Sequence, residues 1–171
     1  MKHTYRATFN KKPEEIILDI QSLKNGTYQV QGELSDKYWA NLCQELELEN
    51  KGGGEATFTI DVSQPIVRIT GEIKTTFERQ CVRTLEMFMD SHTHKVDEHM
   101  TWKEEMAQEE VLYQEDVALD FGDFIYQQIM LGYDLHPVKD RSHRGGVILS
   151  DGYDEMKEDN PFAVLQKLKK S

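Results

Sequence analysis

The residue with the clearest chemical potential is Cys81, which lies between two arginines, Arg79 and Arg83. Neighbouring guanidinium groups favour a thiolate over a thiol, so we expect a lowered pKa for Cys81, as a thiol-dependent enzyme would need. The sequence that follows Cys81, Val-Arg-Thr, matches no catalytic cysteine motif, and the chain contains no Gly-x-Ser-x-Gly nucleophile elbow. We therefore interpret Cys81 as a buried or incidental thiol and predict no catalytic residue.

Three histidines follow Cys81 closely, and two of them have the spacing of a shared metal site. His92 and His94 are two residues apart, which places both on one face of a strand, and His99 follows. The chain has neither a Cys-x-x-Cys nor a His-Glu-x-x-His motif. We therefore interpret these residues as surface histidines and predict no metal and no cofactor.

A run of three glycines, Gly52-Gly53-Gly54, invites comparison with a phosphate-binding loop. It lacks the Lys-Ser/Thr of a Walker motif, and it follows an expected helix instead of preceding one. We interpret the run as a helix terminator.

The chain is acidic, with a formal net charge of -11 from 31 Asp and Glu against 20 Lys and Arg. Such a surface repels a phosphate backbone at long range, which disfavours a general nucleic-acid-binding protein. It suits solubility and would also attract a basic partner. The acid-rich segment 104–123 is expected to be a solvated loop and strand.

Two short basic clusters depart from this acidic background. The first contains Lys139, Arg141 and Arg144, and the second contains Lys167, Lys169 and Lys170. Either cluster can contact RNA phosphates, and the solubility of a loop or capping at the C-terminal end of a helix explains them nearly as well. Both interpretations stay open at this point.

Hydrophobic periodicity predicts an α+β fold: an antiparallel sheet of about five or six strands covered by a few helices, with a long loop before a short C-terminal helix. Expected strands cover 4–9, 27–34, 58–62, 66–77 and 92–102. Expected helices cover 13–23, for which a strand is the alternative, 121–131 and 160–170. A further helix is expected after Ser35, with Trp39, Leu42, Cys43 and Leu46 on one face. Asp120 and Asn160 are expected N-caps, and 136–159 is expected to be a flexible loop.

Length and composition indicate one domain over residues 1–171. No apolar run is long enough to cross a membrane, the N-terminus lacks the features of a signal peptide, and only two cysteines are present. These features predict a cytoplasmic protein.

Four sequence blocks together resemble the YceD family, the large ribosomal RNA subunit accumulation proteins of bacteria and plastids. The blocks are Ile69–Ile73 running into Gln80–Glu86, Asp116–Phe121 with the helix after it, His136–His143, and Asn160–Lys170. The last is similar to the family's terminal Asn-Pro-Phe-Ala-x-Leu-x-x-Leu-Lys. The residues that carry the family motif are Gly71, Cys81, Arg83, Asn160, Pro161 and Phe162.

This resemblance implies a non-enzymatic accessory factor for accumulation of large-subunit ribosomal RNA and for ribosome biogenesis. The implied partners are large-subunit ribosomal RNA or the pre-50S particle, and a basic ribosomal protein. Arg83, with the two basic clusters, would contact RNA or the partner. The alternatives are an interaction adaptor unrelated to the ribosome and a thiol-dependent enzyme that uses Cys81.

The chain departs from the family at one point that concerns a metal. Many members carry a second cysteine in a Cys-x-Arg-Cys block and further cysteines later, an arrangement suited to zinc. Here Thr84 and Arg144 stand at the corresponding positions. A hydroxyl and a guanidinium cannot replace thiolates, so the sequence predicts no zinc site.

Overall fold

The computed structural model describes residues 5–140, which lie almost entirely in one compact unit that ends at Lys139. Its strands are β1 (Tyr5–Thr8), β2 (Ile17–Asp19), β3 (Gly26–Glu33), β4 (Gly52–Ser63), β5 (Ile66–Gln80), β6 (Met87–Thr101), β7 (Leu112–Tyr113) and β8 (Ala118–Asp120). Its helices are α1 (Asp36–Glu45) and α2 (Phe121–Leu131), with short 3-10 turns η1 (Pro13–Glu15) and η2 (Glu104–Met106).

The fold is α+β, as predicted, but the main sheet is mixed. Its six strands follow the order β1-β3-β4-β5-β6-β7, and the pairs β1–β3 and β6–β7 are parallel. The prediction of a purely antiparallel sheet is therefore wrong at both edges. There the chain returns through intervening segments, η1 with β2 on one side and the η2 region on the other, and such crossovers allow parallel pairing where a tight hairpin does not.

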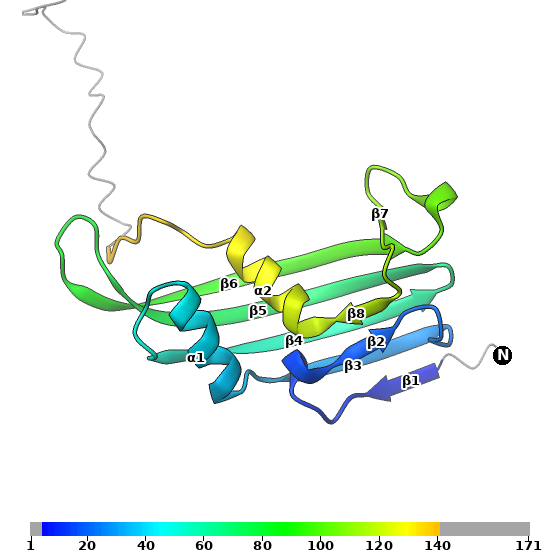
Figure 1. The fold of residues 1–171 in the computed structure, drawn as a ribbon, viewed down its shortest axis with the longest axis horizontal. Helices are drawn as coiled ribbons and strands as arrows, with labels where there is room; N and C mark the ends of the chain where they lie inside the picture. The colour runs from blue at the N-terminus through cyan, green and yellow to red at the C-terminus, as the bar shows by residue number, and fades with distance from the viewer. Residues whose placement is uncertain (1–4, 141–171) are drawn as a thin grey trace, which may run out of the picture. The chain divides into compact units, whose positions relative to one another are not determined.

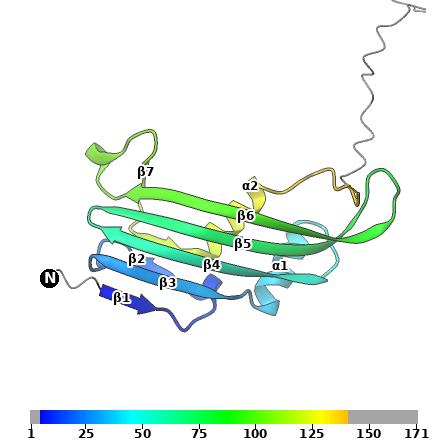
Figure 2. The ribbon, with the colours of Figure 1, turned by 180° about the vertical axis from the view of Figure 1, so that it is seen from behind.

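Both helices and the small sheet of β2 and β8 cover the same face of the main sheet, as Figures 1 and 2 show from opposite sides. Side chains on this covered face form the core, with Phe58, Ile69 and Ile73 fully buried. The neighbouring positions on the other face carry polar groups such as Thr57 and Arg68. This alternation is typical of an antiparallel sheet with one solvated face.

The segment 13–23 is not the helix that we favoured, and its strand alternative is correct in part. Only Pro13–Glu15 forms a helical turn, and β2 follows it. Ile16, Leu18 and Ile20 are all buried while the residues between them are exposed, a period of two that fits a strand. The backbone of β2 pairs with β8 and so gains partners that a helix here would lose.

The prediction that Gly52–Gly54 terminates a helix is also wrong. Helix α1 ends at Glu45, and Glu47 takes the left-handed conformation that turns the chain. The glycines begin β4 instead. A Cβ at Gly52 would lie 1.8 Å from the carbonyl oxygen of Thr76, so glycine allows β4 to approach β5 this closely.

Other predicted elements are confirmed. The side chain of Ser35 accepts a hydrogen bond from the Tyr38 amide at the start of α1, and Cys43 on this helix is buried. Asp120 caps α2 by accepting from the amides of Gly122 and Asp123. The Gln64-Pro65 turn joins β4 and β5, and the strand predicted over 92–102 begins earlier, at Met87.

Some predictions lie outside the described residues, namely most of the loop 136–159 and the whole helix 160–170. The single domain over 1–171 stays a prediction as well. Among residues 5–140, no helix is long and apolar enough to cross a membrane.

Candidate interaction site at the hairpin tip

Strands β5 and β6 extend beyond the rest of the sheet and are joined by Cys81–Glu86, which we call the hairpin tip (Figure 1). The Cys81 amide donates to the carbonyl oxygen of Glu86 (2.8 Å), and the Leu85 amide donates to the carbonyl oxygen of Cys81 (2.9 Å). Leu85 has a φ of 61°, a left-handed conformation that is rare for a branched side chain. The tip is therefore a tight turn that its own backbone holds in shape.

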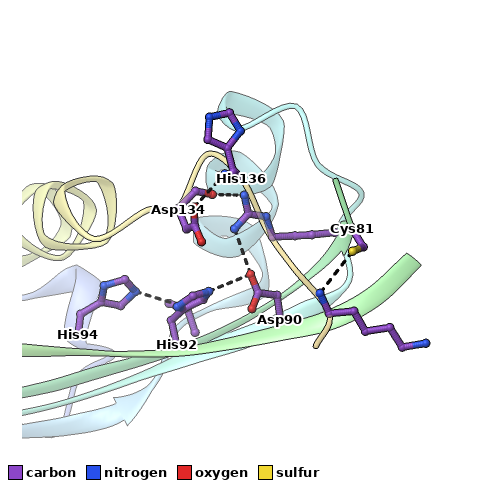
Figure 3. Close-up of polar contacts among 9 residues, drawn as sticks. Cys81, Asp90, His92, His94, Asp134 and His136 are labelled. Atoms are coloured by element: carbon purple, nitrogen blue, oxygen red, sulfur yellow. Dashed lines mark hydrogen bonds and ion pairs between the residues drawn. The ribbon is translucent and has the colours of Figure 1, made fainter. Parts of the chain in front are cut away.

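A second segment, Tyr133–Lys139, returns from the end of α2 and packs on the hairpin tip; we call it the returning segment. The Val82 amide donates to the carbonyl oxygen of Pro137 (3.0 Å), and the Lys139 amide donates to the Cys81 sulfur (3.5 Å; Figure 3). The Lys139 ammonium also pairs with the Glu86 carboxylate (2.9 Å). Residues far apart in sequence thus form one local surface.

Cys81 lies at the centre of this arrangement, with only 1% of its surface exposed. Hydrogen bonds to its sulfur lower the pKa of Cys81 to about 6. The Lys139 amide contributes most, the hydroxyl and the amide of Thr84 contribute less, and the Arg83 amide contributes least. The expected direction of the shift is confirmed, but its expected cause, the guanidinium groups of Arg79 and Arg83, is not among these causes. Backbone and hydroxyl donors stabilise the thiolate here.

Arg79 instead forms a buried ion pair with Asp90, with 3.1 Å between the guanidinium nitrogen and the carboxylate oxygen. Its guanidinium also donates to the carbonyl oxygen of Asp134 and lies 4.4 Å from the centre of the Tyr133 ring. The Asp90 carboxylate contacts His92 Nε2 at 2.8 Å (Figure 3). This network fixes the returning segment to the sheet.

The network was missed by the sequence analysis, although a signal was present. Thr75, Phe77 and Arg79 alternate along β5, and all three face the core. An arginine at a position with core periodicity needs a buried partner, and Asp90 supplies one from β6.

The two paired histidines share one face, as predicted, but they are partly buried and are not surface residues. Burial, and to a lesser extent the neighbouring His92, lowers the pKa of His94. The Thr75 hydroxyl lies 3.2 Å from His94 Nε2, and a Cβ at Gly132 would lie 2.4 Å from the His94 ring. These contacts give His94 a packing role between β6 and α2.

The described residues contain no group of three or more His, Cys, Asp or Glu placed to hold a metal ion. His99 lies on the opposite face of β6 from His92 and His94, because its position differs from theirs by an odd number. The zinc arrangement of the family does not fit the hairpin tip either. Cys81 is its one thiol, and Thr84, at the place of a second thiolate, hydrogen-bonds the sulfur.

The predicted partner-binding residues within residues 5–140 are brought together. Arg83 is exposed on the hairpin tip and Lys139 on the returning segment, and the amides of both contact the Cys81 sulfur. Gly71 has a structural role, because a Cβ there would lie 2.0 Å from the Thr57 carbonyl oxygen on β4. The remaining predicted residues lie outside the described part of the chain: Arg141, Arg144, Asn160, Pro161, Phe162, Lys167, Lys169 and Lys170.

Exposed apolar side chains also lie on the hairpin tip and on the strand that follows it. Val82 and Leu85 on the hairpin tip, with Met87 and Met89 at the start of β6, are all exposed. These exposed residues were not predicted from the sequence, because exposure at a hairpin tip depends on how far the hairpin extends beyond the core. The surface combines cationic and apolar groups, a composition that suits a macromolecular contact.

Comparison with known proteins gives one match. The family model described as "Large ribosomal RNA subunit accumulation protein YceD" matches residues 69–169, which is more than half of the chain and includes the hairpin tip. No curated protein and no solved structure matches the chain. The family match confirms the resemblance seen in the sequence blocks, and the chain therefore belongs to the YceD family.

Proposed function

We propose that this protein is a non-enzymatic accessory factor that supports accumulation of large-subunit ribosomal RNA by contacting the pre-50S particle through the hairpin tip. The observation that carries the proposal is the family match, because the family is described by its role in large ribosomal RNA accumulation and the matched residues include the tip. Arg83 and Lys139 are exposed at this site, and the hairpin tip also exposes the apolar residues Val82 and Leu85, a combination that fits contact with RNA or with protein.

The burial of Cys81 supports a binding function over the thiol-dependent alternative. A nucleophile must reach its substrate, whereas the Cys81 sulfur is buried and accepts several hydrogen bonds from the protein itself. A Cys81→Ser variant that keeps full function in cells would remove the enzymatic alternative. Loss of function in this variant, with folding and partner binding intact, would favour it.

The proposal is tested with paired charge substitutions in a strain that lacks the endogenous protein. Arg83→Gln with Lys139→Gln removes two cations at the site, and Arg68→Gln with Lys74→Gln removes two from the uncovered face of the sheet. The control is well matched, because the side chains of Lys139 and Lys74 are 51% and 52% exposed and each is paired with glutamate. Any general effect of net charge is equal in both variants.

We expect the site variant to sediment less with pre-50S particles and to lower the ratio of large- to small-subunit ribosomal RNA, while the control stays at the wild-type level. Each lost phosphate contact should also reduce the salt dependence of binding by about one unit of slope. Adding Arg141→Gln and Arg144→Gln should weaken the association further. Equal association of the site and control variants would contradict the role of this surface.

The composition of the complexes captured with this protein distinguishes the ribosomal function from the adaptor alternative. Complexes without ribosomal components, purified from cells at physiological salt, would favour a partner outside the ribosome. The acidic surface of the chain is expected to attract a basic ribosomal protein as a second contact.

A further inference from the structure

Strand β6 has an edge that is open along most of its length. It pairs with β5 from Met87 to Thr101, whereas on its other side only Met100 and Thr101 pair with β7. Within residues 5–140, no other strand pairs with this side of β6, which forms the upper margin of the sheet in Figure 1. An unpaired strand edge is a template for an incoming extended chain.

The hydrogen bonds of β6 show which of its backbone groups face this open edge. The carbonyl oxygen of Thr101 accepts from the Gln114 amide and so faces away from β5, whereas Glu86, at the other end, accepts from Cys81 and faces toward β5. Because the backbone N–H and C=O groups of successive residues point to alternate sides of a strand, those of the odd-numbered residues of β6 point to the open edge. Over the central stretch these residues are Thr93, Lys95, Asp97 and His99.

A groove between β6 and α2 runs beside this stretch. It consists of a cavity of about 540 Å³ and a second of about 370 Å³, and Gln128 and Leu131 line both. Met100 and Phe124 lie in the lining of the larger cavity, and the side chain of Leu131 at the junction is 82% exposed. An added strand would therefore find apolar surface for the side chains that point toward α2.

The larger cavity is acidic. Among the described residues, its lining contains the carboxylates of Glu98, Asp116, Asp120 and Asp123 and no lysine, arginine or histidine. Phosphate groups are repelled by such a site, and so is a second copy of this chain, whose net charge is -11. A lysine- or arginine-rich polypeptide is the occupant whose charge is complementary.

We propose that an extended, basic polypeptide segment adds to the open edge of β6 at Thr93–His99, with its apolar side chains in the groove beside α2 and its cations near the four carboxylates. This inference deepens the proposed function, on which it rests for the presence of such a segment in a ribosomal assembly. It assigns protein recognition to this edge and leaves RNA contact to the hairpin tip, so the two surfaces can be tested separately.

The test uses a fluorescent peptide of alternating lysine and valine, with an alternating glutamate and valine peptide as its control. Thr93→Pro removes an outward amide without removing a hydrogen bond to β5, and Thr93→Ala controls for loss of the side chain. We expect the basic peptide to bind the wild type and Thr93→Ala alike, and to bind Thr93→Pro at least about tenfold more weakly. The double variant Glu98→Gln with Asp123→Asn should bind the basic peptide more weakly, and its binding should depend less on salt concentration.

Hydrogen exchange gives a readout that general charge attraction would not change. Peptide binding should slow exchange of the amides of Thr93, Lys95, Asp97 and His99 by about tenfold or more, and should leave the intervening amides, already bonded to β5, unchanged. Binding without this alternating protection, or equal binding to Thr93→Pro, would overturn the proposal. So would tighter binding of an oligouridylate RNA than of the peptide at this edge, or self-association of the chain through it.

The proposed peptide binding at the edge of β6 and the proposed ribosomal function can each be refuted without refuting the other. If wild-type protein associates with pre-50S particles and Thr93→Pro associates equally well, the edge proposal is overturned while the accessory function stands. If the wild type does not associate but the alternating protection is seen with the peptide, the edge proposal stands and the ribosomal function is overturned.

Discussion

Two arginines on β5 pair with aspartates on β6, one pair in the core and one in solvent, and they allow a direct test of what fixes the returning segment. The side chains of Arg79 and Asp90 are 4% and 7% exposed, whereas those of Arg68 and Asp97 are 48% and 55% exposed. The two pairs share strands and chemistry and differ in burial. We predict that Arg79→Met is far more destabilising than Arg68→Met.

The magnitudes follow from what each change leaves behind. Arg79→Met leaves the Asp90 carboxylate buried without its guanidinium partner and removes a donor from the Asp134 carbonyl oxygen. Breaking a buried pair in this way costs about 3–5 kcal/mol of folding free energy. Arg68→Met breaks an exposed pair and should cost at most about 1 kcal/mol.

Urea denaturation followed by tryptophan fluorescence and by circular dichroism measures both variants. The double variant Arg79→Met with Asp90→Leu should recover much of the lost stability, because no uncompensated buried charge remains. In Arg79→Met, the Val82 and Lys139 amides should also exchange faster, since the returning segment loses its attachment. A difference between Arg79→Met and Arg68→Met below about 1 kcal/mol would refute the reasoning.

Three further predictions follow from the site and the sheet. Gly71→Ala should destabilise the protein by about 1–3 kcal/mol or more in urea denaturation, because its Cβ would lie 2.0 Å from the Thr57 carbonyl oxygen, whereas Gly53→Ala, with no atom within 4 Å, should be near neutral. The folded-state pKa of Cys81 is lowered from 9.0 to about 6, which favours the thiolate, so the stability of the wild type relative to Cys81→Ser should rise from pH 6 to pH 9 and be lost as the pH falls through 6. A stability difference that does not change with pH would contradict the thiolate, which an ultraviolet titration detects directly. The lowered pKa of His94 means that the folded state resists protonation, so stability should fall as the pH drops below 6.5, and thermal melts of His94→Gln should show a smaller loss; an identical pH profile would exclude His94 as the cause.

The amino-acid sequence determined much of this protein by itself, because the relevant signals are local. Helix α2 is specified by the Asp120 cap, an apolar face and the Gly132 stop, and the β4–β5 hairpin by alternation around Gln64-Pro65. The family blocks that carry Cys81 and Arg83 are likewise readable in the linear chain.

The tertiary structure decided what depends on distant partners. Segment 13–23 contains apolar residues at both helical and strand spacing, and pairing of β2 with β8 settles the outcome. The pKa of Cys81 depends on the amide of Lys139, 58 residues away in sequence, and the burial of Arg79 depends on Asp90 and the returning segment. The open edge of β6 also depends on tertiary structure, because the sequence of one strand does not say which of its sides another strand covers.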